Sequence, residues 1–212
     1  MPATAAEPIA VPTFDERAPG WDTPRRIARA EEAARAIEAV VEIPPGCRAI
    51  EVGAGTGLLG LALRDHFGTL LLADTSDGML AEAARKVADG HLEGVSTAHF
   101  DLAADDPPAG GPFDLVLSLL LLHHVKDTRA ALAGMRELLA PGGQVAALDL
   151  DTEDGSFHDS GSEGVHHQGF DREALAELAG DVGFRDVRVG NGIPIEDDGR
   201  RYPLFLLTAR RG

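Results

Sequence analysis

Residues 50–58 constrain the fold more than any other stretch of this 212-residue chain. The apolar residues of 49–52 predict a short buried strand, and an apolar helical run at 58–63 follows closely. Between them the chain carries three glycines on alternate positions, Gly53, Gly55 and Gly57. Glycine is needed where the backbone takes a positive φ or where a ligand comes too close for a Cβ. A strand that breaks into a glycine-rich turn and then a helix is typical of a nucleotide-binding corner.

Two kinds of ligand compete for this corner. Residues 55–60 match the G-x-G-x-x-G dinucleotide fingerprint, and Asp74 follows at the expected distance of about 20 residues. However, Glu51 stands on the strand just before the first glycine. A carboxylate there would repel a pyrophosphate, whereas it suits a cationic amino-acid group and sugar hydroxyls. The remainder of the chain has to separate the two interpretations.

Strands and helices alternate along most of the chain, which predicts a parallel sheet with helices on both faces. The periodicity predicts a strand that ends at 52 and further strands at 69–74, 95–100, 113–122 and 144–150. It predicts helices at 24–41, 58–66, 77–87, 128–139 and 171–182, with Thr23, Asp77 and Asp171 as N-caps of the first, third and fifth. Two further strands, 187–195 and 202–210, are joined by only a few residues. A connection that short permits an antiparallel hairpin and no crossover helix.

With the motif E-x-G-x-G-x-G at 51–57, the chain resembles the class I S-adenosylmethionine (SAM)-dependent methyltransferases from about Trp21 to Arg210. The resemblance implies an α/β, Rossmann-like fold with a seven-stranded, mostly parallel sheet and a C-terminal antiparallel hairpin. A standard dinucleotide fold does not end in this way. We expect a disordered tail at 1–13 and, as the resemblance implies, a single SAM-dependent methyltransferase domain at 14–212.

The resemblance implies SAM as cofactor, S-adenosylhomocysteine as product, and a set of binding residues at the carboxyl ends of the strands. Asp74 is placed to accept hydrogen bonds from both ribose hydroxyls. Asp101 would bind the adenine amino group, with Phe100 or Leu102 on the ring, although Asp101 could instead cap a turn. Met79 could line the adenine pocket or be part of the core. The predicted cofactor-binding residues are Glu51, Gly53, Ala54, Gly55, Gly57, Asp74, Thr75, Met79, Phe100, Asp101, Leu102 and Leu119.

His123 and His124 follow the fourth predicted strand at the ligand edge and are the candidate catalytic residues. Methyl transfer is an in-line displacement that needs a base only if the acceptor begins protonated, and histidine can act as that base. In the family this position is frequently part of the cofactor wall, so a structural role for the pair stays open.

Four further residues are predicted to contact the acceptor: Trp21, His158, His166 and His167. Trp21 precedes the first long helix, where we expect a flap over the cofactor; the alternative is that it packs the helix onto the sheet. The three histidines lie in a Gly/Ser-rich loop with several acidic residues, so substrate contact, a metal site or no role are all conceivable. Because the ligand spacing is irregular, we expect no metal and place the three histidines farther from the methyl group than His123 and His124.

The composition of the chain narrows the range of possible binding partners and acceptors. The net charge is −16, with 35 acidic residues against 19 Lys and Arg, which is unfavourable for nucleic-acid binding. Cys47 is the only cysteine and is expected to be buried. Residues 118–122 (SLLLL) lack the Asn/Asp-Pro-Pro-Tyr/Phe motif that nucleobase amino-methylating enzymes share. We therefore expect a small-molecule acceptor, no nucleic-acid or membrane partner, a monomer or homodimer, and a cytoplasmic location. The competing functions are an NAD-dependent oxidoreductase and a non-catalytic SAM-binding module.

The substitution Asp74→Ala should weaken SAM binding roughly 10- to 100-fold, because it removes charge-assisted hydrogen bonds to the ribose. Calorimetry on the folded variant measures this effect. Unchanged affinity would contradict the ribose assignment.

Overall fold

The computed structural model describes residues 13–158 and 164–212. The predicted tail at 1–13 lies outside the described residues except for Thr13, and so does part of the predicted histidine-containing loop, 159–163. Within the described part of the chain, no helix is both long enough and apolar enough to cross a membrane.

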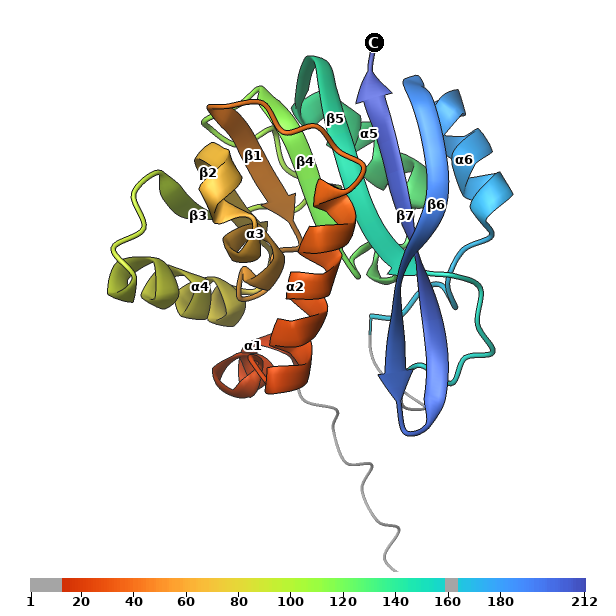
Figure 1. The fold of residues 1–212 in the computed structure, drawn as a ribbon, viewed down its shortest axis with the longest axis horizontal. Coiled ribbons are helices and arrows are strands. Elements are labelled where there is room, and N and C mark those ends of the chain that lie inside the picture. Colours follow the sequence, from red (N-terminus) through yellow and green to blue (C-terminus); the bar gives the residue numbers. More distant parts are fainter. Residues whose placement is uncertain (1–12, 159–163) are drawn as a thin grey trace, which may run out of the picture.

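Seven strands form one sheet in the order β3-β2-β1-β4-β5-β7-β6 (Figure 1). The strands β1 to β5 pair in parallel, and β7 runs antiparallel to both β5 and β6. This topology confirms the predicted Rossmann-like sheet with its C-terminal hairpin. The strands are β1 (Cys47–Val52), β2 (Phe67–Asp74), β3 (Val95–His99), β4 (Phe113–Leu119), β5 (Leu139–Leu150), β6 (Phe184–Asp197) and β7 (Arg200–Arg211).

Most helices are preceded by an N-cap residue, whose side chain accepts a hydrogen bond from a backbone N–H of the first turn. Thr23 caps α2 and Asp171 caps α6, as the sequence predicts. The prediction that Asp77 caps α4 is wrong, because the Ser76 hydroxyl accepts from the Met79 N–H. The helices are α1 (Phe14–Arg17), α2 (Pro24–Glu38), α3 (Leu58–Ala62), α4 (Asp77–Asp89), α5 (Thr128–Leu138) and α6 (Arg172–Asp181).

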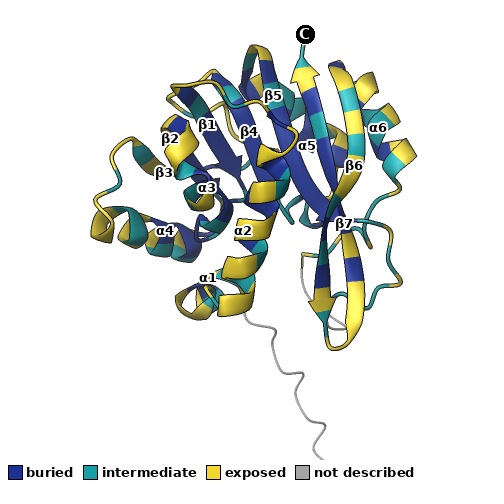
Figure 2. Ribbon diagram, in the orientation of Figure 1, coloured by how far each residue is buried: buried dark blue, intermediate teal, exposed yellow. Residues whose placement is uncertain are grey.

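The central strands are largely buried (Figure 2), and they carry a separate core on each face of the sheet. Alternate residues of a strand point to opposite faces, so Leu115 and Leu117 pack with α2 and α3 while Val116 packs with α5 and α6. Cys47 is buried in the first of these cores, and burial raises the pKa of its thiol to about 11. The two cores hold the strands so that the carboxyl ends of the five parallel strands meet at one edge.

The fourth strand is shorter than predicted. It ends at Leu119, because Leu120 takes a positive φ of 58° and a 3-10 turn, Leu122–His124, follows. The run of leucines at 119–122 has no residue that signals this break. The carboxylate of Asp149, at the end of β5, accepts a hydrogen bond from the Leu122 N–H at 2.7 Å and helps to hold the turn. The turn brings His123 and His124 to the carboxyl edge.

Candidate active site

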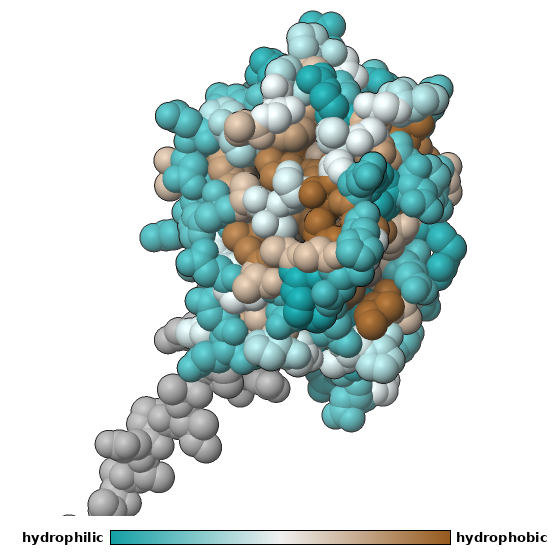
Figure 3. All heavy atoms as spheres, turned by 90° about the vertical axis from the view of Figure 1, so that its left-hand side faces the viewer, coloured by the Kyte–Doolittle hydropathy of each residue, from teal (hydrophilic) through white to brown (hydrophobic). Residues whose placement is uncertain are grey.

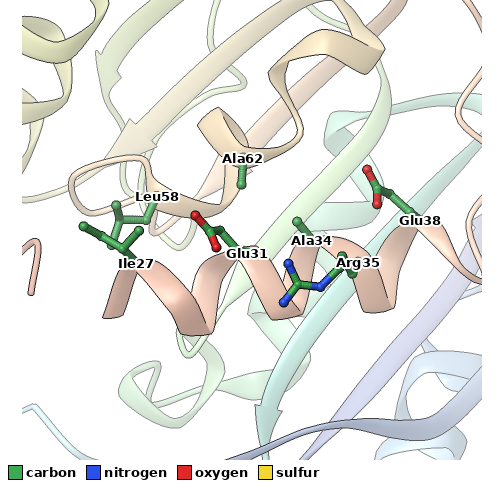
Figure 4. Close-up of a pocket in the computed structure, with 7 residues that line it drawn as sticks. All are labelled: Ile27, Glu31, Ala34, Arg35, Glu38, Leu58 and Ala62. Carbon is green, nitrogen blue, oxygen red and sulfur yellow. The ribbon is translucent and has the colours of Figure 1, made fainter. Parts of the chain in front are cut away.

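A cavity of about 1160 Å³ lies at the carboxyl edge of the sheet, between the strand ends, α1, the start of α2 and the residues flanking 159–163. A space-filling view shows hydrophobic residues gathered in the middle of one face with hydrophilic ones around them (Figure 3). Fifteen of the eighteen predicted site residues line the cavity; the exceptions are Gly57, His166 and His167. A smaller hollow of about 360 Å³ between α2 and α3 contains no predicted site residue (Figure 4).

The three glycines of the corner do different things. All have positive φ: 66° at Gly53, 53° at Gly55 and 79° at Gly57. A Cβ at Gly57 would lie 2.6 Å from a methyl carbon of Leu72, so this glycine is required by the packing of α3 on the sheet. At Gly55 the nearest atoms to a Cβ, in Met79 and Trp21, are 3.9 Å away. Gly55 therefore leaves open space in the cavity wall, where a ligand can approach the backbone.

Asp74 is fixed by the loop that it faces. One carboxylate oxygen accepts from the Gly55 N–H at 2.6 Å and the other accepts from the Ser76 N–H at 2.9 Å. An ionised carboxylate has about four acceptor sites, so capacity for ligand hydroxyls remains. The half-buried carboxylate is thus held in a single orientation at the cavity wall.

Glu51 lines the cavity but is 2% exposed, and one of its oxygens accepts from the Gly60 N–H at 2.8 Å. Burial raises the pKa of its carboxyl to about 8, an effect that the Gly60 hydrogen bond opposes. At neutral pH the free protein therefore holds this carboxyl largely protonated. A cationic ligand group beside it would favour the ionised form.

Asp101 both lines the cavity and makes a turn. One of its oxygens accepts from the Ala103 N–H at 2.8 Å, which is the Asx turn that the sequence left as an alternative. Phe100 is buried and Leu102 is partly buried beside it. Met79 is 1% exposed, yet it also borders the cavity.

The segment before α2 closes one side of the cavity. Asp15 of α1 accepts hydrogen bonds from the Ser76 hydroxyl at 2.6 Å and the Gly78 N–H at 2.8 Å, which joins α1 to the start of α4. Trp21 lies on the cavity wall with its ring 4.0 Å from the Arg26 guanidinium and 5.7 Å from the Phe14 ring. These contacts pack the segment against α2 and α4, and its ordering on binding stays a prediction.

Four arginines that were not predicted as site residues line the same side of the cavity: Arg17, Arg25, Arg26 and Arg29. Arg25 forms an ion pair with Asp197 at 2.7 Å, whereas Arg29 has no hydrogen-bond or ion-pair partner among the described residues. Burial and the charges of Arg25 and Arg26 lower the pKa of Arg29 to about 10, so it stays charged at neutral pH. The spacing of arginines at 25, 26 and 29 of a helix in an acidic chain was the signal that could have indicated this basic wall.

The histidines group differently from the prediction. His158 was expected farther out, but its ring centroid lies 5.0 Å from that of His123 and 5.5 Å from that of His124. His166 and His167 instead lie outside the cavity, where their backbone N–H groups donate to the His123 carbonyl. A His167 ring nitrogen lies 3.0 Å from the Val125 carbonyl oxygen. The backbone of 166–167 thus supports the turn carrying His123, and only His158 joins the pair.

His123 is oriented by a buried carboxylate. Its Nδ1 lies 2.6 Å from an oxygen of Asp149, and both side chains are 1% exposed. A carboxylate only accepts, so the proton is on Nδ1. His124 has its Nδ1 2.8 Å from the Gly164 carbonyl oxygen. Burial lowers the pKa values of His124 and His158 to about 4, so both are neutral at pH 7.

Comparisons with known proteins agree with this geometry. Residues 50–145 match the model of a methyltransferase domain. A solved SAM-dependent methyltransferase from Aquifex aeolicus superposes with a TM-score of 0.69 at 17% identity, over 93% of this chain and 98% of that one. Residues 50–145 therefore match a methyltransferase domain, and the superposition shows the fold of such a domain. The predicted resemblance is confirmed.

Relatives of this methyltransferase domain occur in proteins of different size. An uncharacterized methyltransferase of Mycobacterium tuberculosis is 31% identical over 116 residues, which cover 55% of this chain and 56% of that protein. A polyketide synthase-nonribosomal peptide synthetase of Pyricularia oryzae is 31% identical over 131 residues, 58% of this chain but 3% of that protein. The matched stretch therefore spans about half or much less of these curated relatives.

Glu51 makes the stability of the cofactor-free protein depend on pH. Its pKa is about 8 in the fold and 4.5 for an unperturbed Glu carboxyl, so between these values the folded chain keeps a proton that the unfolded chain has lost. Stability should fall as pH rises through this window. We expect Glu51→Gln to raise the melting temperature relative to the native protein more at about pH 8.5 than at about pH 5.

Calorimetric melting at the two pH values measures this difference, with the exposed Glu42→Gln as the matched control. The control should show no such dependence on pH. An equal shift for Glu51→Gln at both values would contradict the raised pKa.

Proposed function

We propose that the protein transfers the methyl group of SAM to a small-molecule acceptor that carries a negative charge. One observation carries the proposal: the cavity that contains Gly55 and Asp74 also contains an arginine wall in a chain of net charge −16. The first two residues suit the cofactor, and the arginines suit an anion. The same cavity therefore has room and chemistry for both reactants.

The cofactor lies along the ends of β1, β2 and β3 in this proposal. Asp74 accepts from the ribose hydroxyls, and Glu51 faces the cationic amino group. Phe100, Leu102 and Met79 enclose the adenine, and Ala54, Thr75 and Leu119 complete the contact. Gly57 acts through the packing of α3 instead of through contact, because its Cβ position is occupied by Leu72.

Transfer proceeds by in-line displacement. A lone pair of the acceptor attacks the methyl carbon while the S–C bond breaks, and the electron pair stays on sulfur to give S-adenosylhomocysteine. The protein contributes mainly by holding the two reactants in line with water excluded. An acceptor whose attacking atom is already anionic needs no base, which suits the low pKa of His124 and His158. Trp21 and His158 lie on the wall where the acceptor enters.

The basic wall supports an anionic acceptor because Arg29 is half-buried and has no partner among the residues that the structure describes. Leaving a charge partly desolvated and unpaired is unfavourable. A carboxylate or phosphate would pair with the guanidinium through charge-assisted hydrogen bonds. Arg25, by contrast, already pairs with Asp197.

Binding of S-adenosylhomocysteine distinguishes the proposal from an NAD-dependent oxidoreductase. Trp21 is the only tryptophan and lies on the cavity wall, so we expect its emission to shift on addition of S-adenosylhomocysteine and not of NAD. Formation of S-adenosylhomocysteine from SAM is then measured with pairs of candidate acceptors, in which a carboxylic acid is compared with its uncharged amide. The proposal expects faster transfer to the acid. Binding without transfer to any acceptor would favour the non-catalytic module, and a response to NAD alone would contradict the proposal.

The substitution Arg29→Gln tests whether the arginine wall binds the acceptor. We expect it to raise the acceptor KM roughly tenfold, with less than about a threefold change in S-adenosylhomocysteine affinity, because it removes one charge-assisted hydrogen bond. The control is Arg188→Gln, which removes the same charge from an exposed position on β6. A loss of S-adenosylhomocysteine affinity with an unchanged acceptor KM would assign Arg29 to the cofactor carboxylate and contradict the anionic acceptor.

A further inference from the structure

Three histidine rings meet in the wall of the cavity: His123, His124 and His158. The His123 and His124 ring centroids are 4.1 Å apart, and His158 lies 5.0 and 5.5 Å from them. One ring nitrogen from each residue falls within 4.8 Å of the other two. Residues from a strand-end turn and from a distant loop therefore converge on one point.

Hydrogen bonds select the nitrogens that face this point. The Nδ1 atom of His123 is taken by Asp149 at 2.6 Å, and that of His124 is taken by the Gly164 carbonyl at 2.8 Å. The rings of His123 and His124 thus present Nε2 as the free nitrogen. The Nε2 atoms of His123 and His158 are buried and have no hydrogen-bond partner in the described part of the chain.

Two unpartnered buried nitrogens in one cluster need a physical reason, because buried polar atoms nearly always have a partner. His123 is 1% exposed, so bulk solvent does not satisfy its nitrogen. A shared cation would satisfy all three Nε2 lone pairs at once. The buried Asp149 would then act as the carboxylate that orients a metal-binding histidine and raises its basicity.

We propose that the Nε2 atoms of His123, His124 and His158 bind one divalent transition-metal ion. Three imidazoles without a carboxylate ligand suit Zn²⁺ and its neighbours in the first transition row, and not Mg²⁺ or Ca²⁺. Three ligands leave a fourth position of a tetrahedral site open. That position faces the cavity, where it takes a water molecule or an oxygen or sulfur anion.

The cluster is slightly wider than a bound site. Nitrogens that share a tetrahedral zinc ion at about 2.05 Å lie about 3.3 Å from one another, and the three here lie within 4.8 Å of one another. Small rotations of the His124 and His158 rings close this difference, while Asp149 holds His123. The irregular ligand spacing of His158, His166 and His167 predicts no metal. The structure instead brings His158 together with His123 and His124.

The metal site gives the acceptor a second anion-binding contact, and this consequence rests on the proposed function. An acceptor hydroxyl or thiol at the open position would lose its proton to solvent, because the ion lowers its pKa. Metal binding itself does not depend on methyl transfer. A failure of the transfer proposal therefore leaves the metal site to be judged by binding alone.

Titration of the metal-free full chain with Zn²⁺ in a calorimeter tests the site. We expect one ion per chain, and we expect His158→Gln and His124→Gln each to weaken binding at least roughly 10- to 100-fold, since ligand loss should exceed the loss of an orienting residue. Co²⁺ in place of Zn²⁺ should give the visible absorption of a four-coordinate site in the native chain only. His123→Gln is avoided as the main test because the residue is buried and could affect folding.

The control is His91→Asn, which removes an exposed histidine outside the cluster and suits the positive φ of 48° at that position. Its Zn²⁺ affinity should equal that of the native chain. Melting in chelator checks that every variant is folded. Absence of a stoichiometric ion, or unchanged affinity in folded His124→Gln and His158→Gln, would overturn the proposal.

Discussion

The buried carboxylate of Asp149 holds together the part of the structure on which the candidate chemistry depends. It accepts from the Leu122 N–H at 2.7 Å, the Leu150 N–H at 2.8 Å and His123 Nδ1 at 2.6 Å. A charge that is 0% exposed is tolerated only when it is paired and hydrogen-bonded. These bonds join the end of β5 to the turn after β4, and so set the position of both adjacent histidines.

The cavity differs in charge from the protein around it. Acidic residues dominate the chain, whereas arginines of α1 and α2 line part of the cavity wall. Glu51 and Asp74 lie on the corner side, each fixed by backbone N–H groups. The cavity thus has one side that suits hydroxyls and a cationic amino group, and another that suits an anion. A sulfonium cofactor and an anionic acceptor would meet between them.

Much of the fold could be predicted from local patterns. Apolar runs and caps such as Thr23 and Asp171 indicated where elements begin, and the short 196–199 connection indicated the hairpin. The end of β4 could not be predicted, because Leu119 to Leu122 are chemically alike and the break at Leu120 depends on bonds from β5. Ser and Asp are about equally good N-caps, and Ser76, which also donates to Asp15 of α1, is the residue that caps α4.

The sequence by itself determined the class of fold and the glycine-rich turn after β1, because glycine spacing and apolar periodicity act over a few residues. It also placed Asp74 and His123 at the carboxyl edge, since parallel strands end together there. Only the tertiary structure decided which distant side chains meet. His158 lies 34 to 35 positions from His124 and His123 along the chain, yet shares their cluster, while His166 and His167 do not line the cavity. The path of a loop is set by its packing and hydrogen bonds across the fold, and no local pattern in its own residues encodes those contacts.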